Sequence, residues 1–402
     1  MSILQDRLME HLSMLSHEIG CRPVGTAGNS AAADYIKKIL SDIGAEVEDQ
    51  EFEVPVWELA EAFLEINNER LDVTANTFSI PCETAGELVS FCTLDELESA
   101  SDLQGKIALL YGELSKENYV PKGFTIYNPE HHKKAIGLLE SKNPSAIITV
   151  QMQNGKRLPL ISDWDFSIPS VTVSPETGLF IKECQTAKLV IKSKKSPGAT
   201  RNIIGRIPGK VKEKIILAAH YDTVFNTNGA FDNASGVSIM LTLAEEIAKR
   251  KNWKTGFEFI AFSSEEYLGA GDEIYLKEYK EDLHNALAAL NFDGIGQSLG
   301  TNNITLMSGS DELETRVKTI KNDFPAVHWT NPWYESNHYT FFSNGVPSIP
   351  FSCSGVSDLL HTTDDTLRWI SPDKLSEVFS LAWNVLIDLQ DKSAVWTRGS
   401  SS

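Results

Sequence analysis

Ile215-Ile-Leu-Ala-Ala-His220-Tyr-Asp222 is the stretch around which this chain is organised. Its five consecutive apolar residues predict a strand that is buried on both faces, as the strands of a parallel sheet are. A His and an Asp follow as the strand ends, and a loop rich in Gly and Asn then leads to Phe231-Asp232-Asn233-Ala-Ser-Gly236. Open α/β sheets bind their ligands at the carboxyl ends of the strands, so these polar residues are candidates for the chemistry.

From Asn202 onward, strand-like and helix-like segments alternate. Strands are expected at 215–219, 257–262, 286–292, 303–307 and 346–349, and helices near 234–249, 266–279, 313–323 and 372–389. The alternation predicts an α/β fold with a mostly parallel central sheet and helices on both faces.

The part of the chain before Asn202 predicts a second domain. A total length of 402 residues also favours two domains over one. Two helices, near 3–15 and 32–43, and an edge strand at 45–54 come first. From 57 to 198 short β-rich segments with one helix, at 130–140, predict an inserted α+β domain, and His131 and His132 on that helix are expected at the surface. The expected division is a catalytic domain at 1–56 and 199–391, an insert at 57–198, and a disordered tail at 392–402.

Composition limits the partners and the compartment. A net charge of -19 would repel nucleic-acid phosphates and anionic lipid, so neither partner is expected. There is no run of 18 apolar residues and no secretory signal pattern at the N-terminus. The five cysteines are scattered and follow no metal-site spacing, which favours a reducing cytoplasm.

Each candidate residue has a structural alternative. Asp232-Asn233 before a helix resembles a helix cap, and Ser263-Ser-Glu-Glu266 has the spacing of a capping box. Asp293-Gly294 is an ordinary turn pair, and His361 lies in a polar loop. Taken singly, each structural interpretation is the stronger one, because short motifs produce many false positives.

Taken together, the candidates predict a metal centre. One group of residues follows the predicted strand ends, which converge on one edge of a parallel sheet: His220, Asp232, Glu266, Asp293 and His361. So much negative charge requires a cation, and imidazole with carboxylate but no thiolate suits zinc. Five ligands exceed the needs of one catalytic zinc, so two zinc ions bridged by a carboxylate and a water are expected.

Two further carboxylates lie next to these ligands. Asp222 is expected to accept the second N–H of His220 and to fix its tautomer, with a simple turn residue as the alternative. Glu265, beside Glu266, is expected to face the bridging water as a general base and to return the proton to the leaving amine.

The chain resembles the co-catalytic di-zinc aminopeptidases, a family that includes glutaminyl cyclases and the glutamate carboxypeptidase II and transferrin receptor group. The resemblance rests on the following series: His220-Tyr-Asp222, Asp232-Asn-Ala-Ser-Gly236, Ser264-Glu-Glu266, Asn291-Phe-Asp293 and His361-Thr…Asp365-Thr366. It implies a phosphorylase/hydrolase-like fold. It also implies that Asp232 bridges the two zinc ions and that His220, Glu266, Asp293 and His361 are terminal ligands, with Glu265 as general base and Asp222 behind His220. The insert is similar to a protease-associated (PA) domain, through Gly105-Lys-Ile-Ala-Leu-Leu and Ile168-Pro-Ser-Val-Thr-Val-Ser.

Two positions depart from the family pattern. Leu360 stands where some relatives have a Tyr that helps the oxyanion, and Ser336-Asn337-His338 stands where many have Ser-Asp-His. The expected function is an aminopeptidase that hydrolyses the N-terminal bond of peptides. The alternatives are a glutaminyl cyclase, a carboxypeptidase-mode hydrolase, and a non-catalytic binding protein on the same scaffold. Oligomeric state is left open.

Overall fold

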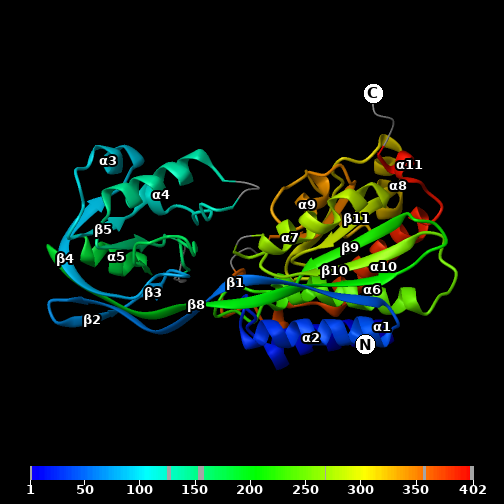
Figure 1. Cartoon of the computed structure of the whole chain (residues 1–402), viewed down its shortest axis with the longest axis horizontal. Helices are drawn as coiled ribbons and strands as arrows, with labels where there is room; N and C mark the ends of the chain where they lie inside the picture. Colours follow the sequence, from blue (N-terminus) through cyan, green and yellow to red (C-terminus); the bar gives the residue numbers. More distant parts are fainter. Residues whose placement is uncertain (1, 125–127, 153–157, 268, 356–358, 399–402) are drawn as a thin grey trace. The chain divides into compact units, whose positions relative to one another are not determined.

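The computed structural model divides the chain into two compact units (Figure 1). Unit 1 comprises Met1–Val54 and Ala199–Ser402, and unit 2 comprises Pro55–Gly198. The structure describes residues 2–124, 128–152, 158–267, 269–355 and 359–398.

Unit 1 is built on a mixed sheet whose centre is parallel. The central strands, in the order β14-β11-β9-β10, are β14 (Ser348–Ser354), β11 (Ala286–Phe292), β9 (Lys214–His220) and β10 (Gly256–Phe262), all parallel to their neighbours. Beyond β14 lie β12 (Thr301–Ile304), antiparallel to it, and β13 (His328–Trp329); beyond β10 lies β8 (Thr186–Ile207), also antiparallel. The predicted α/β fold with a mostly parallel sheet is confirmed.

Side chains of β9 alternate between two cores, one on each face of the sheet. Ile215 and Leu217 belong to the larger core, whereas Ile216 and Ala218 belong to the smaller one. The larger core includes side chains of α1 (Ile3–Ser13), α2 (Ala27–Asp42), α6 (Ser235–Ala248), α8 (Asp311–Lys321) and α10 (Pro372–Leu389). The smaller core includes those of α7 (Ala270–Tyr279) and α9 (His338–Phe342). An apolar run without alternation is therefore the correct pattern for this strand.

Unit 2 has two hydrophobic cores of its own, one on each face of its strands. Next to the first part of β8, its strands follow in the order β4-β5-β6-β7-β3: β4 (Cys82–Phe91), β5 (Lys106–Leu110), β6 (Ala146–Val150), β7 (Ser170–Val173) and β3 (Thr74–Ala75). Strands β4 to β7 are parallel, whereas β4 is antiparallel to β8 and β3 is antiparallel to β7. Its helices are α3 (Leu94–Ser99), α4 (Glu130–Lys142) and α5 (Pro175–Ile181). The expectation of one helix is wrong, because α3 and α5, capped by Thr93 and Ser174, are too short to show a helical repeat.

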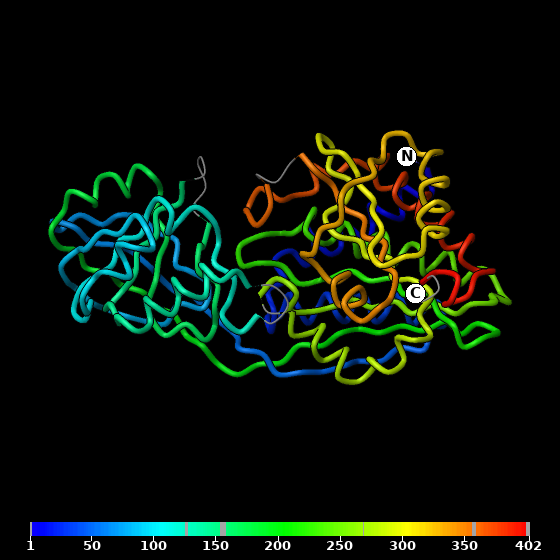
Figure 2. Tube along the Cα trace, turned by 90° about the horizontal axis from the view of Figure 1, so that it is seen from above, coloured from blue at the N-terminus to red at the C-terminus, as the bar shows by residue number. Residues whose placement is uncertain are grey.

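Two long strands carry the chain between the units. β1 (Glu46–Ile66) and β8 pair with each other, and both views show them running side by side (Figure 2). β1 also forms a hairpin with β2 (Glu69–Asp72). Short helical turns complete the chain: η1 (Met14–Ile19), η2 (Gly112–Ser115), η3 (Ala230–Ala234), η4 (Lys280–Asn285) and η6 (Leu367–Trp369).

The predicted disordered tail at 392–402 is wrong over its described part. Residues Ala394–Arg398 form helix α11, and Thr397 is fully buried. The Arg398 guanidinium donates hydrogen bonds to the carbonyl oxygens of Ala286 (2.7 Å) and Leu283 (2.9 Å). These acceptors are backbone groups far away in sequence, which no local pattern reveals. Residues 399–402 lie outside the described part.

All five cysteines are free thiols. Among the described helices, none is long and apolar enough to cross a bilayer. The cytoplasmic location stays a prediction.

Candidate metal centre

The structure brings all seven predicted site residues to one edge of the unit 1 sheet. His220 is the last residue of β9, and the others lie in the segments that follow a strand: Asp222 after β9, Asp232 in η3, Glu265 and Glu266 after β10, Asp293 after β11, and His361 after β14. Parallel strands end at the same edge, so four separate segments meet there.

The Asp232 carboxylate lies at the centre of this group. Its Oδ1 atom is 3.1 Å from Nε2 of His220, and its Oδ2 atom is 3.2 Å from Nε2 of His361. Asp293 Oδ1 lies 3.4 Å from the same His220 nitrogen, and Glu266 Oε2 lies 3.1 Å from the same His361 nitrogen. The residues thus form two sets of three donors that share Asp232.

The tautomer of His220 suits a metal ligand. Its Nδ1 atom lies 3.3 Å from the carbonyl oxygen of Asp222 and 3.7 Å from the Asp222 carboxylate. Both are acceptors, so Nδ1 carries the proton of the neutral ring and Nε2 presents a lone pair. That nitrogen points toward the carboxylate oxygens of Asp232 and Asp293, an arrangement that suits a cation between them, either a metal ion or, in the metal-free site, a proton on Nε2. Within the described residues, buried Asp232 Oδ1 and Glu266 Oε1 also meet no hydrogen-bond donor.

The Asp222 side chain has a further function beyond its contact with His220. Its two carboxylate oxygens accept the backbone N–H groups of Glu265 (3.2 Å) and Glu266 (3.3 Å). The carboxylate is fully buried. It therefore fixes the loop that carries Glu265 and Glu266, while its backbone carbonyl makes the closer contact with His220.

The pKa shifts of the site record an excess of negative charge. Burial raises the pKa of Glu265 well above its usual range, and the charges of Asp293 and Glu266 raise it further although His220 opposes them. Burial and the Asp232 carboxylate raise the pKa of Glu266 to about 7. Burial alone would lower the pKa of His220, but the surrounding carboxylates raise it well above its usual range.

The helix-cap alternatives do not describe these residues. Helix α6 begins after Ala234 with no side-chain cap, and the Asp232 carboxylate is directed at the two histidines instead. The Ser263–Glu266 segment starts no helix: α7 begins at Ala270, with Gly269 at its N-cap. Ser264 has a positive φ of 65°. This backbone conformation is not a feature of a capping box.

The family comparison agrees with this geometry. Residues 202–386 match the model of peptidase family M28. The chain is similar to this family over that region, which is a little under half of its length. Together with the cluster of metal-ligand side chains, this similarity supports a metallopeptidase, as the resemblance implied.

Known relatives cover most of the chain. Aminopeptidase YwaD of Bacillus subtilis is 26% identical over 392 residues, which are 92% of this chain and 81% of the relative. The probable lipoprotein aminopeptidase LpqL of Mycobacterium tuberculosis is 25% identical, over 72% of this chain and 58% of the relative. Among solved structures, BSAP, a zinc aminopeptidase from Bacillus subtilis, has a TM-score of 0.78 at 22% identity and covers 98% of each chain.

Three residues that support the metallopeptidase site were given no role from the sequence: Asn233, Asp365 and Arg22. The Asn233 amide donates to the carbonyl oxygen of Phe292 (2.8 Å) and accepts from the N–H of Gly294 (3.3 Å), so it holds the backbone on both sides of Asp293. Asn233 and Asp365 lie inside the sequence motifs that carry the family resemblance, so their positions indicated a role near the site. Arg22 lies in a loop near the N-terminus, and its acceptors are carbonyl groups, which leave no trace in the sequence.

Asn337, the departure from Ser-Asp-His, has a clear partner. Its amide nitrogen donates to Asp272 Oδ2 (2.8 Å), and Thr340 Oγ1 donates to the other oxygen of the same carboxylate. Burial raises the pKa of Asp272 to about 6, although these two hydrogen bonds act against the shift. An Asp at 337 would place a second carboxylate against a buried one.

Replacing Asn337 by Asp is expected to destabilise the metallopeptidase by about 3 kcal/mol at pH 8, because one buried charge is left uncompensated. The folded pKa of Asp272 already lies above its usual 3.8, so folding favours the protonated form and stability falls as pH rises from about 4 to 6. In the variant, the carboxyl groups at 272 and 337 share one proton, so the loss of stability continues to higher pH. Thermal unfolding at pH 5 and pH 8 measures this loss of stability. The double variant Asp272→Asn/Asn337→Asp restores one donor and one acceptor and is the control; a single variant as stable as wild type at pH 8 contradicts the account.

Leu360, the other departure, packs against the larger core of unit 1. An apolar side chain offers no hydrogen bond to an oxyanion, so this position contributes packing only.

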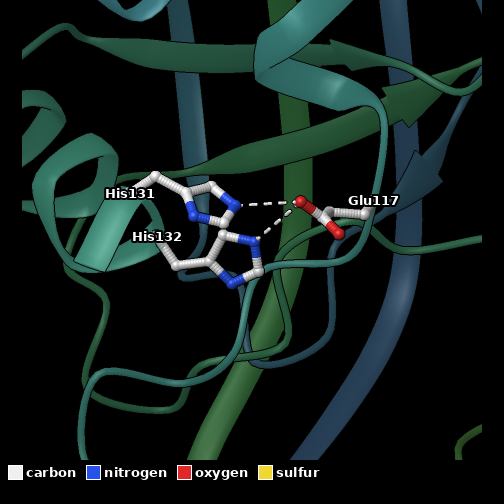
Figure 3. Close-up of side chains that lie close together, drawn as sticks. All are labelled: Glu117, His131 and His132. Atoms are coloured by element: carbon white, nitrogen blue, oxygen red, sulfur yellow. Dashed lines mark hydrogen bonds and ion pairs between the residues drawn. The ribbon is translucent and has the colours of Figure 1, made fainter. Parts of the chain in front are cut away.

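A second group with metal-ligand chemistry lies in unit 2 (Figure 3). Nε2 of His131 is 2.9 Å and Nε2 of His132 is 3.4 Å from Glu117 Oε1. His131 is exposed as predicted, but the surface prediction is wrong for His132, whose ring is buried against Tyr119. The two rings meet at 4.4 Å because both side chains turn toward Glu117 at the start of α4, despite their adjacent positions.

The tautomer of His132 argues against a metal there. The backbone N–H of Val120 donates to Nδ1 of His132 (3.2 Å), so the proton of the neutral ring is on Nε2. Nε2–H then faces Glu117 Oε1 at 3.4 Å, an ion-pair contact without hydrogen-bond geometry. A metal-bound histidine normally binds the metal with one nitrogen and donates a hydrogen bond from the other. His220 has this arrangement, because its Nδ1 faces acceptors. His132 has the reverse arrangement, because its Nδ1 accepts a hydrogen bond. The group links Glu117 to helix α4 through the hydrogen bond between Glu117 and His131.

Proposed function

We propose that this metallopeptidase is a zinc aminopeptidase that binds two zinc ions. His220, Asp293 and Asp232 would hold one ion, and His361, Glu266 and Asp232 would hold the other. The observation that supports this best is that the two oxygens of Asp232 face different histidines, at 3.1 and 3.2 Å. The names of the relatives, aminopeptidase YwaD and the zinc aminopeptidase BSAP, agree with the assignment.

When bound, the zinc ions would polarise the substrate carbonyl and make water a better nucleophile at neutral pH. The protein supplies the proton transfer. Glu265 Oε2 lies 3.9 Å from His220 Nε2, and the side chain is about 20% exposed, so it reaches the site and remains open to substrate. Its backbone N–H is held by Asp222, which fixes the direction of the side chain. Glu265 takes a proton from the attacking water and returns it to the leaving amine.

An aminopeptidase also has to recognise a free α-amino group. A relative that covers most of this chain, YwaD of Bacillus subtilis, is named an aminopeptidase. The amine is therefore proposed as the recognised end of the peptide. This favours the aminopeptidase over a carboxypeptidase mode.

We also propose that unit 2, Pro55–Gly198, is the PA-like domain expected at 57–198. A parallel sheet of β4 to β7 with a separate core on each face supports its independence. No role in catalysis is assigned to it.

The proposed activity is tested with leucyl anilide, its N-acetylated form, and a peptide with N-terminal Gln. Hydrolysis of the free-amine substrate is expected, with kcat/KM at least 100-fold lower after acetylation, full loss with chelator, and recovery with zinc. Equal turnover of the acetylated substrate would overturn amine recognition. Cyclisation of the Gln peptide without anilide hydrolysis would identify a glutaminyl cyclase, and zinc binding without turnover would identify a binding protein.

A further inference from the structure

Arg22 is a fully buried cation in the loop between η1 and α2. Its guanidinium donates five hydrogen bonds, all to carbonyl oxygens. The acceptors and distances are Tyr221 (2.9 Å), Leu15 (2.8 Å), Gly20 (2.7 Å), Asn228 (2.8 Å) and Gly229 (3.0 Å). Burial lowers its pKa to about 10, against the attraction of Asp365, Asp222 and Asp232, so it is still charged at neutral pH.

These five bonds join three segments of the chain. Leu15 and Gly20 belong to η1 and its end, and Tyr221 directly follows His220. Asn228 and Gly229 form the turn before Asp232. Gly229 has a φ of 55°, and a Cβ atom there would come within 2.3 Å of the Asp232 carbonyl oxygen and 3.0 Å of the guanidinium. Arg22 therefore contacts the backbone beside His220 and the turn that leads to Asp232.

Asp365 holds the same segment from its other end. Its carboxylate accepts the N–H of Phe231 at 2.7 Å and the N–H of Asp232 at 3.0 Å. The side chain is buried. In the five residues from Asn228 to Asp232, the carbonyls of Asn228 and Gly229 thus bond to a cation, and the N–H groups of Phe231 and Asp232 bond to an anion.

We propose that Arg22 and Asp365 are positioning residues that hold the Asp232 peptide from both sides, so that its two carboxylate oxygens face the two histidines before any metal binds. The inference rests on the proposed function for the identity of the metal, but the preorganisation of Asp232 is a property of the metal-free chain.

Lysine cannot replace Arg22 in this role. An ammonium group has three N–H donors on one nitrogen, whereas the guanidinium has five N–H donors on three nitrogens and reaches acceptors along several edges of its plane. An Asn at 365 retains one acceptor oxygen and turns an NH2 group toward the second backbone N–H. Both substitutions keep the size of the side chain nearly constant and remove the hold on Asp232.

Arg22→Lys and Asp365→Asn are compared with the matched controls Arg7→Lys and Asp388→Asn, whose native side chains form the ion pairs Arg7–Glu245 and Asp388–Arg316 away from the site. The zinc Kd of each metal-free protein is measured by competition with a chromophoric chelator, well below its unfolding temperature. We expect zinc binding 10- to 100-fold weaker in the two test variants and a similar fall in kcat with KM changed less than threefold. The controls should stay within twofold of wild type. Folded test variants with wild-type zinc affinity would overturn the proposal.

Hydrogen exchange of the wild-type protein tests the positioning of Asp232 even if a variant does not fold. The amide hydrogens of Phe231 and Asp232 should exchange slowly both with and without zinc, because Asp365 already binds them. Fast exchange that becomes slow only on zinc addition would show that the metal orders this segment, and the proposal would be wrong. A wild-type protein that binds no zinc but protects these amides would refute the proposed function and leave the positioning intact.

Discussion

Glu265→Gln is expected to lower kcat by about 10³-fold with zinc content unchanged, because it removes the general base and no proposed ligand. Gln has nearly the same shape, and the backbone N–H that Asp222 holds at 3.2 Å is unaffected. The amide cannot accept the proton from water, so substrate still binds and the chemical step fails. Steady-state kinetics with a free-amine anilide and metal analysis of the same sample measure both quantities.

The matched control for this variant is Glu117→Gln, which removes an exposed carboxylate in unit 2 that also lies beside histidines. It should retain full activity. A Glu265→Gln enzyme with more than a tenth of the wild-type kcat would remove Glu265 from the mechanism.

Asp232→Asn should have the largest effect, with activity lost by about 10⁴-fold or more and less than two zinc ions retained per chain. The substitution replaces one of the two shared oxygens with an NH2 group and removes the negative charge that lies between His220 and His361. An amide is a poor zinc ligand compared with carboxylate or imidazole. Zinc per chain after dialysis against metal-free buffer, together with kcat/KM, measures the loss.

Asp323→Asn, on the surface after α8, controls for the change of charge and should keep wild-type metal content. If Asp232→Asn retained two tightly bound ions, the carboxylate would not be shared between them.

The sheet of unit 1 was predictable because its strands are buried on both faces. Runs such as Ile215–Ala219 are too short for a typical helix and end in polar residues, which favours a strand buried on both faces. The strand order and the antiparallel β8 and β12 at its sides depend on pairings between distant segments, which the local pattern does not contain. The short helices α3 and α5 were missed because six or seven residues hold less than two full helical repeats.

The site was predictable to the extent that strand ends converge. His220 ends β9, Asp293 directly follows β11, and Asp232 lies in the segment after β9, so position relative to the strands predicted that they lie together. The residues that hold them were harder to find. Arg22 binds backbone carbonyls, and Asn233 binds the peptides beside Asp293, and neither kind of partner has a side-chain signature. His132 was misplaced because helical periodicity describes Cβ directions and not the rotation of two rings toward one carboxylate.

The most direct test of the central claim is a crystal structure of the zinc-loaded protein with anomalous data collected on both sides of the zinc absorption edge. The account predicts two anomalous peaks in unit 1, one beside His220 and Asp293 and the other beside His361 and Glu266, with the Asp232 carboxylate between them. No peak is expected beside Glu117, His131 and His132. A single peak in unit 1, or two peaks of which only one is bonded to Asp232, would contradict it.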